Sequence, residues 1–275
     1  LLLLLLLQVL ASCLWLGHGE VVTSLQSSCP QFFFWQTPPN AALTPQNPAW
    51  ICQRYGNKYH FATLYDRDQR IPVYSAYLYQ PGSGSRPNTW LVEPQLVNLS
   101  LPEDMNTEGY VLDVLKVNEN ILRNSQAVSE DYDHLTGYHR GHLNPCSNNN
   151  NINSTMATFT LTNVVPQHAS LNMGQWKRYE THTMRNMTRN CVTTYVVVGA
   201  VPGYNSTPNR RVNIPSHIWS SACCQLNNNK MKAWGVIAEN NRNAVQELSL
   251  GQLENRLTQL YGNGQVYLFN NLCPR

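Results

Sequence analysis

Two short runs of sequence, Y-H-R-G-H-L-N-P and L-N-M-G-Q-W, restrict the fold of this chain more than any other feature. The first run contains Arg140 and His142, and the second contains Asn172. An imidazole can accept a proton, a guanidinium pairs with phosphate oxygens, and an amide oxygen can bind a hard metal ion. These groups can act together only if the two runs lie side by side, so the sequence predicts a strand-loop-strand-helix unit.

The side chains of the first run suit the hydrolysis of a phosphodiester bond. His142 would take a proton from an attacking water, a role worth roughly 10²- to 10⁴-fold in rate. Arg140 would stabilise charge on the same phosphate, and Gly141 would allow a close backbone approach or a positive φ. The plainer alternatives are a structural histidine and a surface arginine. The second run makes a purely structural role for His142 less favoured.

The second run supplies the predicted metal ligand, Asn172. Mg²⁺ held by one neutral amide oxygen would keep several of its waters. Glu180 lies eight residues further on, about 12 Å along a helix, so it would act through a metal-bound water rather than as a second ligand. Asn172 could instead cap the start of the helix, and the two roles are compatible.

Asn163 is the second amide of interest, on a strand expected from Thr158 to Val165. A buried amide is costly unless it is hydrogen-bonded, so Asn163 should find a partner at the site. Gln167 follows it and would help to orient the loop. Trp176 is expected to pack in the core rather than stack on a substrate.

The spacing from residue 138 to residue 180 resembles the signature of the DNA/RNA non-specific endonucleases with the ββα-metal (His-Me) finger, whose core motif reads D-R-G-H. The resemblance implies that His142 is the general base, that Arg140 stabilises the transition state, and that Asn172 holds one divalent ion, Mg²⁺ or Mn²⁺. It implies supporting catalytic roles for Asn163 and Glu180. It also implies a nucleic-acid substrate, DNA first and RNA second.

Two further points bear on the resemblance. Segments near residues 29–34, 51–55 and 61–77 are similar to a secreted vertebrate branch of the family, the endonuclease domain-containing 1 proteins. The motif also departs from the family pattern, because His139 stands where the leading Asp is expected. If that Asp orients the arginine or holds a metal-bound water, activity should be reduced. If it only supports the loop, little should change.

The start of the chain predicts passage through the secretory route. Residues 1–19 resemble a signal peptide without its initiator Met, and their apolar run of about 16 residues is short for a membrane span, which needs about 20. Residues 20–275 would form one domain. Seven cysteines outside the leader predict disulfides with one thiol left over, and glycan acceptors are expected at Asn98, Asn153, Asn186 and Asn205. These features predict a secreted glycoprotein.

The pattern along the chain predicts an α+β fold with a mixed, mostly antiparallel sheet and a ββα-metal unit. The expected elements are a hairpin (59–66 and 71–80), short helices near 101–106 and 118–130, a helix over 170–188, strands at 195–201 and 231–238, a helix over 249–261 capped by Ser249 and Gln252, and a closing strand at 266–269.

Net charge is only +3, so a polyanion would have to be bound by a local cluster of cations rather than by the field of the whole protein. Two other functions compete with nucleic-acid hydrolysis. One is a glycosylated binding module that keeps the nuclease scaffold without useful turnover, a reading that the modest charge and His139 favour. The other is a zinc site formed by His134, His139, His142 and Cys146, although their spacings are loose.

Overall fold

The computed structural model describes residues 20–82, 86–227 and 230–275. The expected signal peptide, residues 1–19, lies outside these ranges. Within them the largest feature is an eight-stranded antiparallel sheet in the order β1-β2-β3-β4-β7-β10-β11-β12. Its strands are β1 (Val21–Val22), β2 (Pro48–Tyr55), β3 (Lys58–Asp66), β4 (Ile71–Leu78), β7 (Cys191–Val201), β10 (His217–Leu226), β11 (Met231–Glu239) and β12 (Gln246–Leu248).

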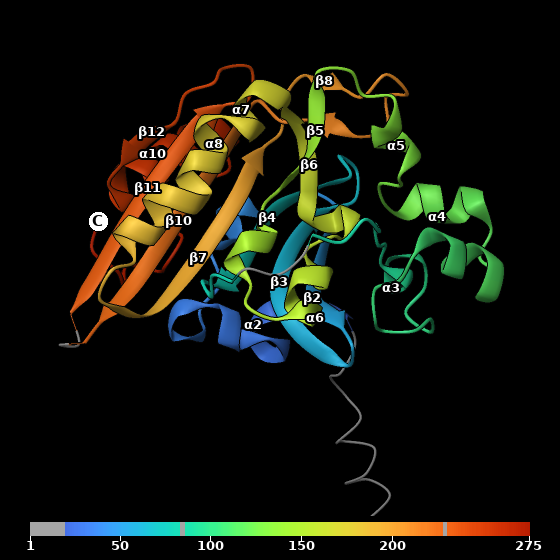
Figure 1. Cartoon of the computed structure of the whole chain (residues 1–275), viewed down its shortest axis with the longest axis horizontal. Coiled ribbons are helices and arrows are strands. Elements are labelled where there is room, and N and C mark those ends of the chain that lie inside the picture. Colours follow the sequence, from blue (N-terminus) through green and yellow to red (C-terminus); the bar gives the residue numbers. More distant parts are fainter. Residues whose placement is uncertain (1–19, 83–85, 228–229) are drawn as a thin grey trace, which may run out of the picture.

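Helices cover both faces of this sheet, which gives three layers (Figure 1). On one face lie α7 (Ala169–Met173), α8 (Gln175–Arg178), the π-turn η7 (Tyr179–Thr183) and α9 (Met184–Met187), which bury Trp176, Tyr179 and Met184. On the other face α10 (Leu250–Tyr261) buries Leu250, Leu253 and Leu257. Alternate residues of β7 serve the two cores, so the α+β expectation is confirmed.

Local sequence signals explain the best-predicted elements. The hairpin of β3 and β4 forms as expected, with Pro72 near the start of β4, where a missing N–H is tolerated. Helix α10 begins with the expected capping box, because Ser249 accepts from the N–H of Gln252 and the Gln252 side chain accepts from the N–H of Ser249. Gly262 ends the helix with a φ of 69°.

Several expectations are corrected. Residues 101–106 are not helical, and the helix expected over 118–130 is split into α4 (Glu119–Ser125) and α5 (Glu130–Asp133). The strand expected over 158–165 is replaced by a 3₁₀ turn, η6 (Leu161–Asn163), followed by β6 (Val164–His168). Residues 266–269 do not close the sheet. Their apolar side chains pack as an irregular segment in the same core as α10.

Three disulfides tie the described chain together: Cys29–Cys52, Cys191–Cys224 and Cys223–Cys273. The adjacent cysteines 223 and 224 point to opposite faces of β10, so each bonds on its own side of the sheet. Cys146 is the free thiol among the described residues. The expectation of disulfides with one cysteine left over is confirmed.

Among the described residues, no helix combines the length and the apolar character that crossing a membrane requires.

Candidate active site

The predicted motif lies on a small hairpin beside the large sheet, formed by β5 (Tyr138–His142) and β6 (Val164–His168) (Figure 1). Helix α7 follows β6 directly, so the hairpin and helix form the expected strand-loop-strand-helix unit. Successive side chains of a strand point to opposite faces. Arg140 and His142 therefore share one face of β5, and His139 and Gly141 share the other.

Gly141 is required by the close approach of the neighbouring strand. A Cβ atom built on Gly141 would lie 2.3 Å from Gln167 Oε1 and 2.5 Å from Gln167 Cβ. The close approach to Gly141 is therefore made by the Gln167 side chain, which fills the space that a Cβ atom would need. Both polar atoms of the Gln167 amide are buried without a hydrogen-bond partner among the described residues.

His142 is shielded by two aromatic rings. Its ring centroid lies 4.8 Å from that of Phe159, edge to face, and 5.4 Å from that of Trp90. The Nε2 atom is buried and has no hydrogen-bond partner in the described chain. Burial, and secondly the positive charge of Arg86, lower the pKa of His142 to about 3. The imidazole is therefore neutral at physiological pH and can accept a proton, but in this conformation it is a weak base whose Nε2 atom is shielded from water, although the residue as a whole is half-buried.

Arg140 lies on the same face and is already paired. Its guanidinium forms an ion pair with Asp133 at 2.6 Å and donates to the carbonyl of Ser129 at 3.1 Å. It also lies over the rings of Trp90 (5.1 Å) and Tyr132 (5.5 Å). Trp90 thus contacts both motif residues. A phosphate approaching Arg140 would meet a cation whose orientation is fixed by α5.

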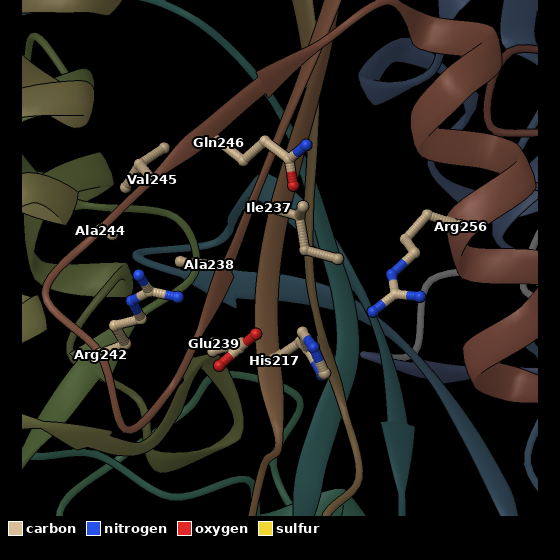
Figure 2. Close-up of a pocket in the computed structure, with 9 residues that line it drawn as sticks. All are labelled: His217, Ile237, Ala238, Glu239, Arg242, Ala244, Val245, Gln246 and Arg256. Carbon is tan, nitrogen blue, oxygen red and sulfur yellow. The ribbon is translucent and has the colours of Figure 1, made fainter.

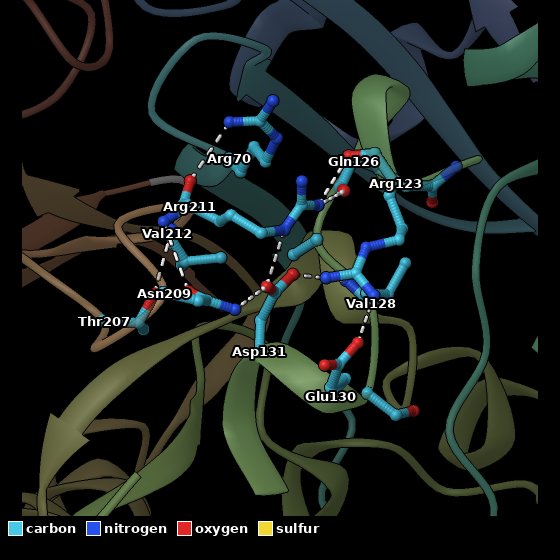
Figure 3. Close-up of polar contacts among 12 residues, drawn as sticks. Arg70, Arg123, Gln126, Val128, Glu130, Asp131, Thr207, Asn209, Arg211 and Val212 are labelled. Carbon is cyan, nitrogen blue, oxygen red and sulfur yellow. Dashed lines mark hydrogen bonds and ion pairs between the residues drawn. The ribbon is translucent and has the colours of Figure 1, made fainter. Parts of the chain in front are cut away.

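A buried ion pair holds α5 in place (Figure 3). The Asp131 side chain, with no exposed surface, accepts from Arg211 Nε at 2.8 Å, from Asn209 Nδ2 at 2.7 Å and from the Val128 N–H at 2.9 Å. Arg211 also donates to main-chain carbonyls at the end of α4. We call Asp131, Asn209 and Arg211 the clasp. It joins α4 and α5 to the 207–213 loop and so fixes the groups that hold Arg140.

Asn163 anchors the loop that follows His142. It is fully buried at the end of η6, not on a strand as expected. Its Oδ1 accepts from Ser75 Oγ (2.9 Å) and the Asn144 N–H (3.0 Å), and its Nδ2 donates to the carbonyls of Asn144 (3.0 Å) and Thr158 (2.9 Å). The expected hydrogen-bond partners are present, and all four bonding positions of the amide are filled. This arrangement suits a positioning role.

Asn172 lies inside α7, where it contacts the unusual motif residue. His168 occupies the N-cap position, so the alternative of Asn172 as a helix cap is wrong. Asn172 Nδ2 and His139 Nδ1 are 3.1 Å apart. With the amide nitrogen directed to His139, Asn172 Oδ1 has no hydrogen-bond partner among the described residues, as a metal ligand requires.

Glu180 lies two helical segments further on, in η7, with α8 between them. Burial raises the pKa of Glu180 to about 8, against the smaller opposing effects of Trp176 and Lys177. Burial also raises the pKa of the Cys146 thiol, while Arg86 lowers it and Glu180 raises it. Arg86 and Glu180 therefore lie close enough to Cys146 to change its titration. A nearby divalent cation would favour the ionised form of Glu180.

Arg86 and Trp90 were missed by the sequence reasoning. Both come from the segment between β4 and the hairpin, more than 50 residues before His142 in the sequence. A lone cation and a lone aromatic residue in a run rich in Gly, Ser and Pro are the only signals that could have drawn attention to them. Nothing in local periodicity predicts that they meet His142.

The residues present fit a single hydrated ion better than a closed metal site. In the described ranges no group of three or more His, Cys, Asp and Glu side chains is placed to hold a metal. The alternative zinc site of His134, His139, His142 and Cys146 is therefore wrong. A hard ion bound to one amide oxygen and to waters remains compatible with Asn172.

Comparisons with known proteins agree with this arrangement. A family described as DNA/RNA non-specific endonuclease matches residues 38–261. The chain is 34% identical over 216 residues to the Homo sapiens endonuclease domain-containing 1 protein and 33% identical to that of Mus musculus, in each case covering 76% of this chain and 40% of the relative. It thus spans well under half the length of these relatives.

More distant relatives share the fold or part of the sequence. The mitochondrial nuclease EXOG of Homo sapiens is 32% identical over 117 residues, 38% of this chain and 31% of that protein. A chain in the crystal structure of the EndoG/EndoGI complex, described as showing the mechanism of EndoG inhibition, is 16% identical with a TM-score of 0.53, covering 78% of this chain and 84% of that one. The family match covers most of the chain, and the chain belongs to the DNA/RNA non-specific endonuclease family.

Proposed function

We propose that this protein is a divalent-metal-dependent, sequence-tolerant endonuclease that hydrolyses phosphodiester bonds in DNA and RNA. The observation that carries the proposal is the neutral, unpartnered Nε2 of His142 on the strand that also carries Arg140, with the free Oδ1 of Asn172 on the helix after the hairpin. Proton acceptor, cation and hard-ion ligand are therefore on one unit.

In the proposed reaction, a water attacks phosphorus while His142 Nε2 takes its proton. The bond from phosphorus to the leaving oxygen breaks, and that oxygen is protonated from solvent. One Mg²⁺ or Mn²⁺ on Asn172 Oδ1 would neutralise charge on the phosphate oxygens. Arg140 stabilises the same charge, Asn163 holds the loop after His142, and Glu180 orients water.

For this chemistry the shielded imidazole has to become accessible. Burial is the largest cause of the low pKa of His142, so displacement of Trp90 by substrate would raise that pKa toward about 6.5 and strengthen the base. The active form therefore requires a movement of the Trp90 side chain.

We propose that the protein acts outside the cell. Three disulfides among the described residues suit an oxidising compartment. The four glycan acceptors, Asn98, Asn153, Asn186 and Asn205, are all exposed.

A second function, a binding module without turnover, is favoured by two observations: Nε2 of His142 is buried, and His139 replaces a carboxylate at the edge of the site. Such a module would bind nucleic acid and a divalent ion but leave plasmid DNA intact.

The test is plasmid nicking during a Mg²⁺ titration. We expect nicking that a chelator abolishes, and we expect Asn172→Ala to need at least tenfold more Mg²⁺, since it removes the only proposed protein ligand. Asn120→Ala, at an exposed position in α4, is the matched control and should nick as wild type does. Binding of nucleic acid without nicking at any Mg²⁺ or Mn²⁺ concentration would reject the enzyme in favour of the binding module.

A further inference from the structure

A polar groove away from His142 contains two arginines without ion pairs. A pocket of about 230 Å³ is lined by His217 and Glu239 at the ends of β10 and β11, by Arg242 in the following loop and by Arg256 on α10 (Figure 2). The guanidinium groups of Arg242 and Arg256 lie on opposite sides of it. Neither forms an ion pair or side-chain hydrogen bond within the described residues, although Glu239 lines the same pocket.

The groove continues toward the catalytic hairpin. An adjoining pocket of about 380 Å³ shares His217, Glu239 and Arg256 with the first and adds Tyr138 and Tyr204. Tyr204 is fully exposed. Tyr138 is the first residue of β5, and His142 is the last, so the two are about 13 Å apart along the strand. We call these two pockets together the arginine groove.

The loop that carries Arg242 is attached directly to the candidate active site. Asn240 Nδ2 donates to the carbonyl of Pro166 at 2.9 Å, and Asn240 Oδ1 accepts from the N–H of His168 at 2.9 Å. Asn243 Oδ1 accepts from the N–H of Gln175, the first residue of α8, at 2.8 Å. The inner side of this loop therefore supports β6 and α8, while its outer side faces the groove.

The chemistry of the groove fits a phosphodiester backbone with unpaired bases. Unpaired guanidinium groups bind phosphate oxygens in bidentate fashion, and an exposed tyrosine offers a surface on which a base can stack. The charge of Arg256 helps to lower the pKa of His217, after burial and against Glu239, so Arg256 lies near this other lining residue of the groove. Two cations on opposite sides of one groove can each contact a phosphate of a backbone that runs between them.

We propose that the arginine groove binds the backbone of single-stranded nucleic acid on one side of the scissile phosphate, with Arg242 and Arg256 on phosphates and Tyr204 under a base. This inference rests on the proposed nuclease function, because it extends the substrate from His142 along β5. Because the net charge of the protein is only +3, a polyanion has to be bound by a local cluster of cations, and Arg242 and Arg256 would form that cluster.

Binding is measured by fluorescence anisotropy with an oligothymidine of about 15 nucleotides, in chelator so that nothing is cleaved. All proteins carry Asn205→Gln, since Asn205 is a glycan acceptor in the groove. We expect Arg242→Ala/Arg256→Ala to weaken binding on the order of tenfold and to reduce the slope of log affinity against log salt by about 1.4, or about 0.7 for each lost phosphate contact. Glu239→Gln should tighten binding, because it removes a like charge from the path of the polyanion.

The matched control removes two charges at the far end of the sheet. Arg185 and Arg189 are exposed and precede the start of β7. The other end of β7 pairs with His217 of the groove, so these arginines are about 35 Å from the groove. Arg185→Ala/Arg189→Ala should leave the affinity within twofold of wild type. If both double variants weaken binding equally, or if neither does, the groove is not the binding surface and the proposal is overturned.

The same proteins are tested with a heparin fragment of matched charge. If the groove variant loses heparin binding but keeps its affinity for the oligonucleotide, the groove is a glycan site and the proposal is wrong. Plasmid nicking in Mg²⁺ separates this proposal from the proposed function. If the groove variant binds the oligonucleotide more weakly but wild type does not nick plasmid, only the proposed catalysis is rejected. If wild type nicks plasmid but the groove variant binds the oligonucleotide as tightly as wild type, only the groove proposal is rejected.

Discussion

Replacing Trp90 by alanine should return the pKa of His142 toward the ordinary value of a histidine. The Trp90 ring lies 5.4 Å from the His142 ring, and burial is the largest cause that lowers the pKa to about 3. The gap to the ordinary value of about 6.5 is about 3.5 pH units, which corresponds to about 5 kcal/mol between the two protonation states. Phe159 and Arg86 remain in the variant, so we expect the pKa to rise by about 1 to 2 units.

The assay is an NMR titration of the histidine ring protons, with His142→Ala used to assign the His142 signal. Trp90→Phe keeps an aromatic cover and should titrate close to wild type. His60 is the internal control, because burial lowers its pKa, against the opposing effect of its hydrogen bond to the Tyr55 carbonyl, and Trp90 takes no part in either effect. An unchanged His142 midpoint in Trp90→Ala, with Trp90→Phe also unchanged, would refute the idea that this ring shields the base.

The same shift sets a pH dependence of stability. Because the folded pKa of His142 lies below its unfolded value, the unfolded state binds more protons between about pH 6.5 and pH 3. Wild type should therefore lose stability as pH falls through this window. Trp90→Ala should lose less stability over the same pH range. The measurement is the free energy of unfolding of each protein at each pH, relative to its own value at neutral pH.

Three further predictions concern the support of the site. Gly141→Ala should cost about 1–3 kcal/mol in the free energy of unfolding and reduce nicking, because the new methyl group collides with Gln167; urea titration and plasmid nicking measure this, and wild-type values in both would contradict it. Wild type should lose stability as pH rises from about 4.5 to about 8, because the raised pKa of Glu180 lets the folded state bind a proton that the unfolded state has released. Glu180→Gln should not show this loss, and identical thermal midpoints of wild type and variant across that range would refute the prediction. Asp131→Ala should cost about 3–5 kcal/mol, because it leaves the Arg211 charge of the clasp without its buried partner, and a cost below 1 kcal/mol in equilibrium denaturation would show that the clasp is dispensable.

The elements that the sequence predicted correctly are those with a clear local pattern. The capping box of Ser249 and Gln252 predicted α10, and alternation with a turn predicted the β3–β4 hairpin. Strand β10 was missed because its run H-I-W-S-S-A-C-C-Q-L has no clear alternation. It is buried on both faces, where Ser220 accepts from the Tyr179 hydroxyl and Ser221 donates to the Val197 carbonyl, and these partners are far away in sequence.

The apolar run at residues 266–269 has the composition of a strand but forms no strand in the structure. The N–H of Leu268 donates instead to the buried Glu254 on α10, a tertiary contact that no local pattern reveals. At the site, the motif gave the positions of His142, Arg140 and Asn172. The cover formed by Trp90 and the cation Arg86 depends on a segment folding back from a distant part of the chain.

The proposed reaction requires His142 to act as the proton acceptor. The direct measurement is the rate of plasmid nicking by His142→Gly at saturating Mg²⁺, with and without added imidazole. We expect the variant to be slower than wild type by roughly 10²- to 10⁴-fold, and we expect imidazole to restore part of the rate in proportion to its concentration. His182→Gly, at an exposed position in η7, should nick as wild type does. A His142→Gly protein that nicks at the wild-type rate, or one that is folded and slow but indifferent to imidazole, would contradict the role assigned to this residue.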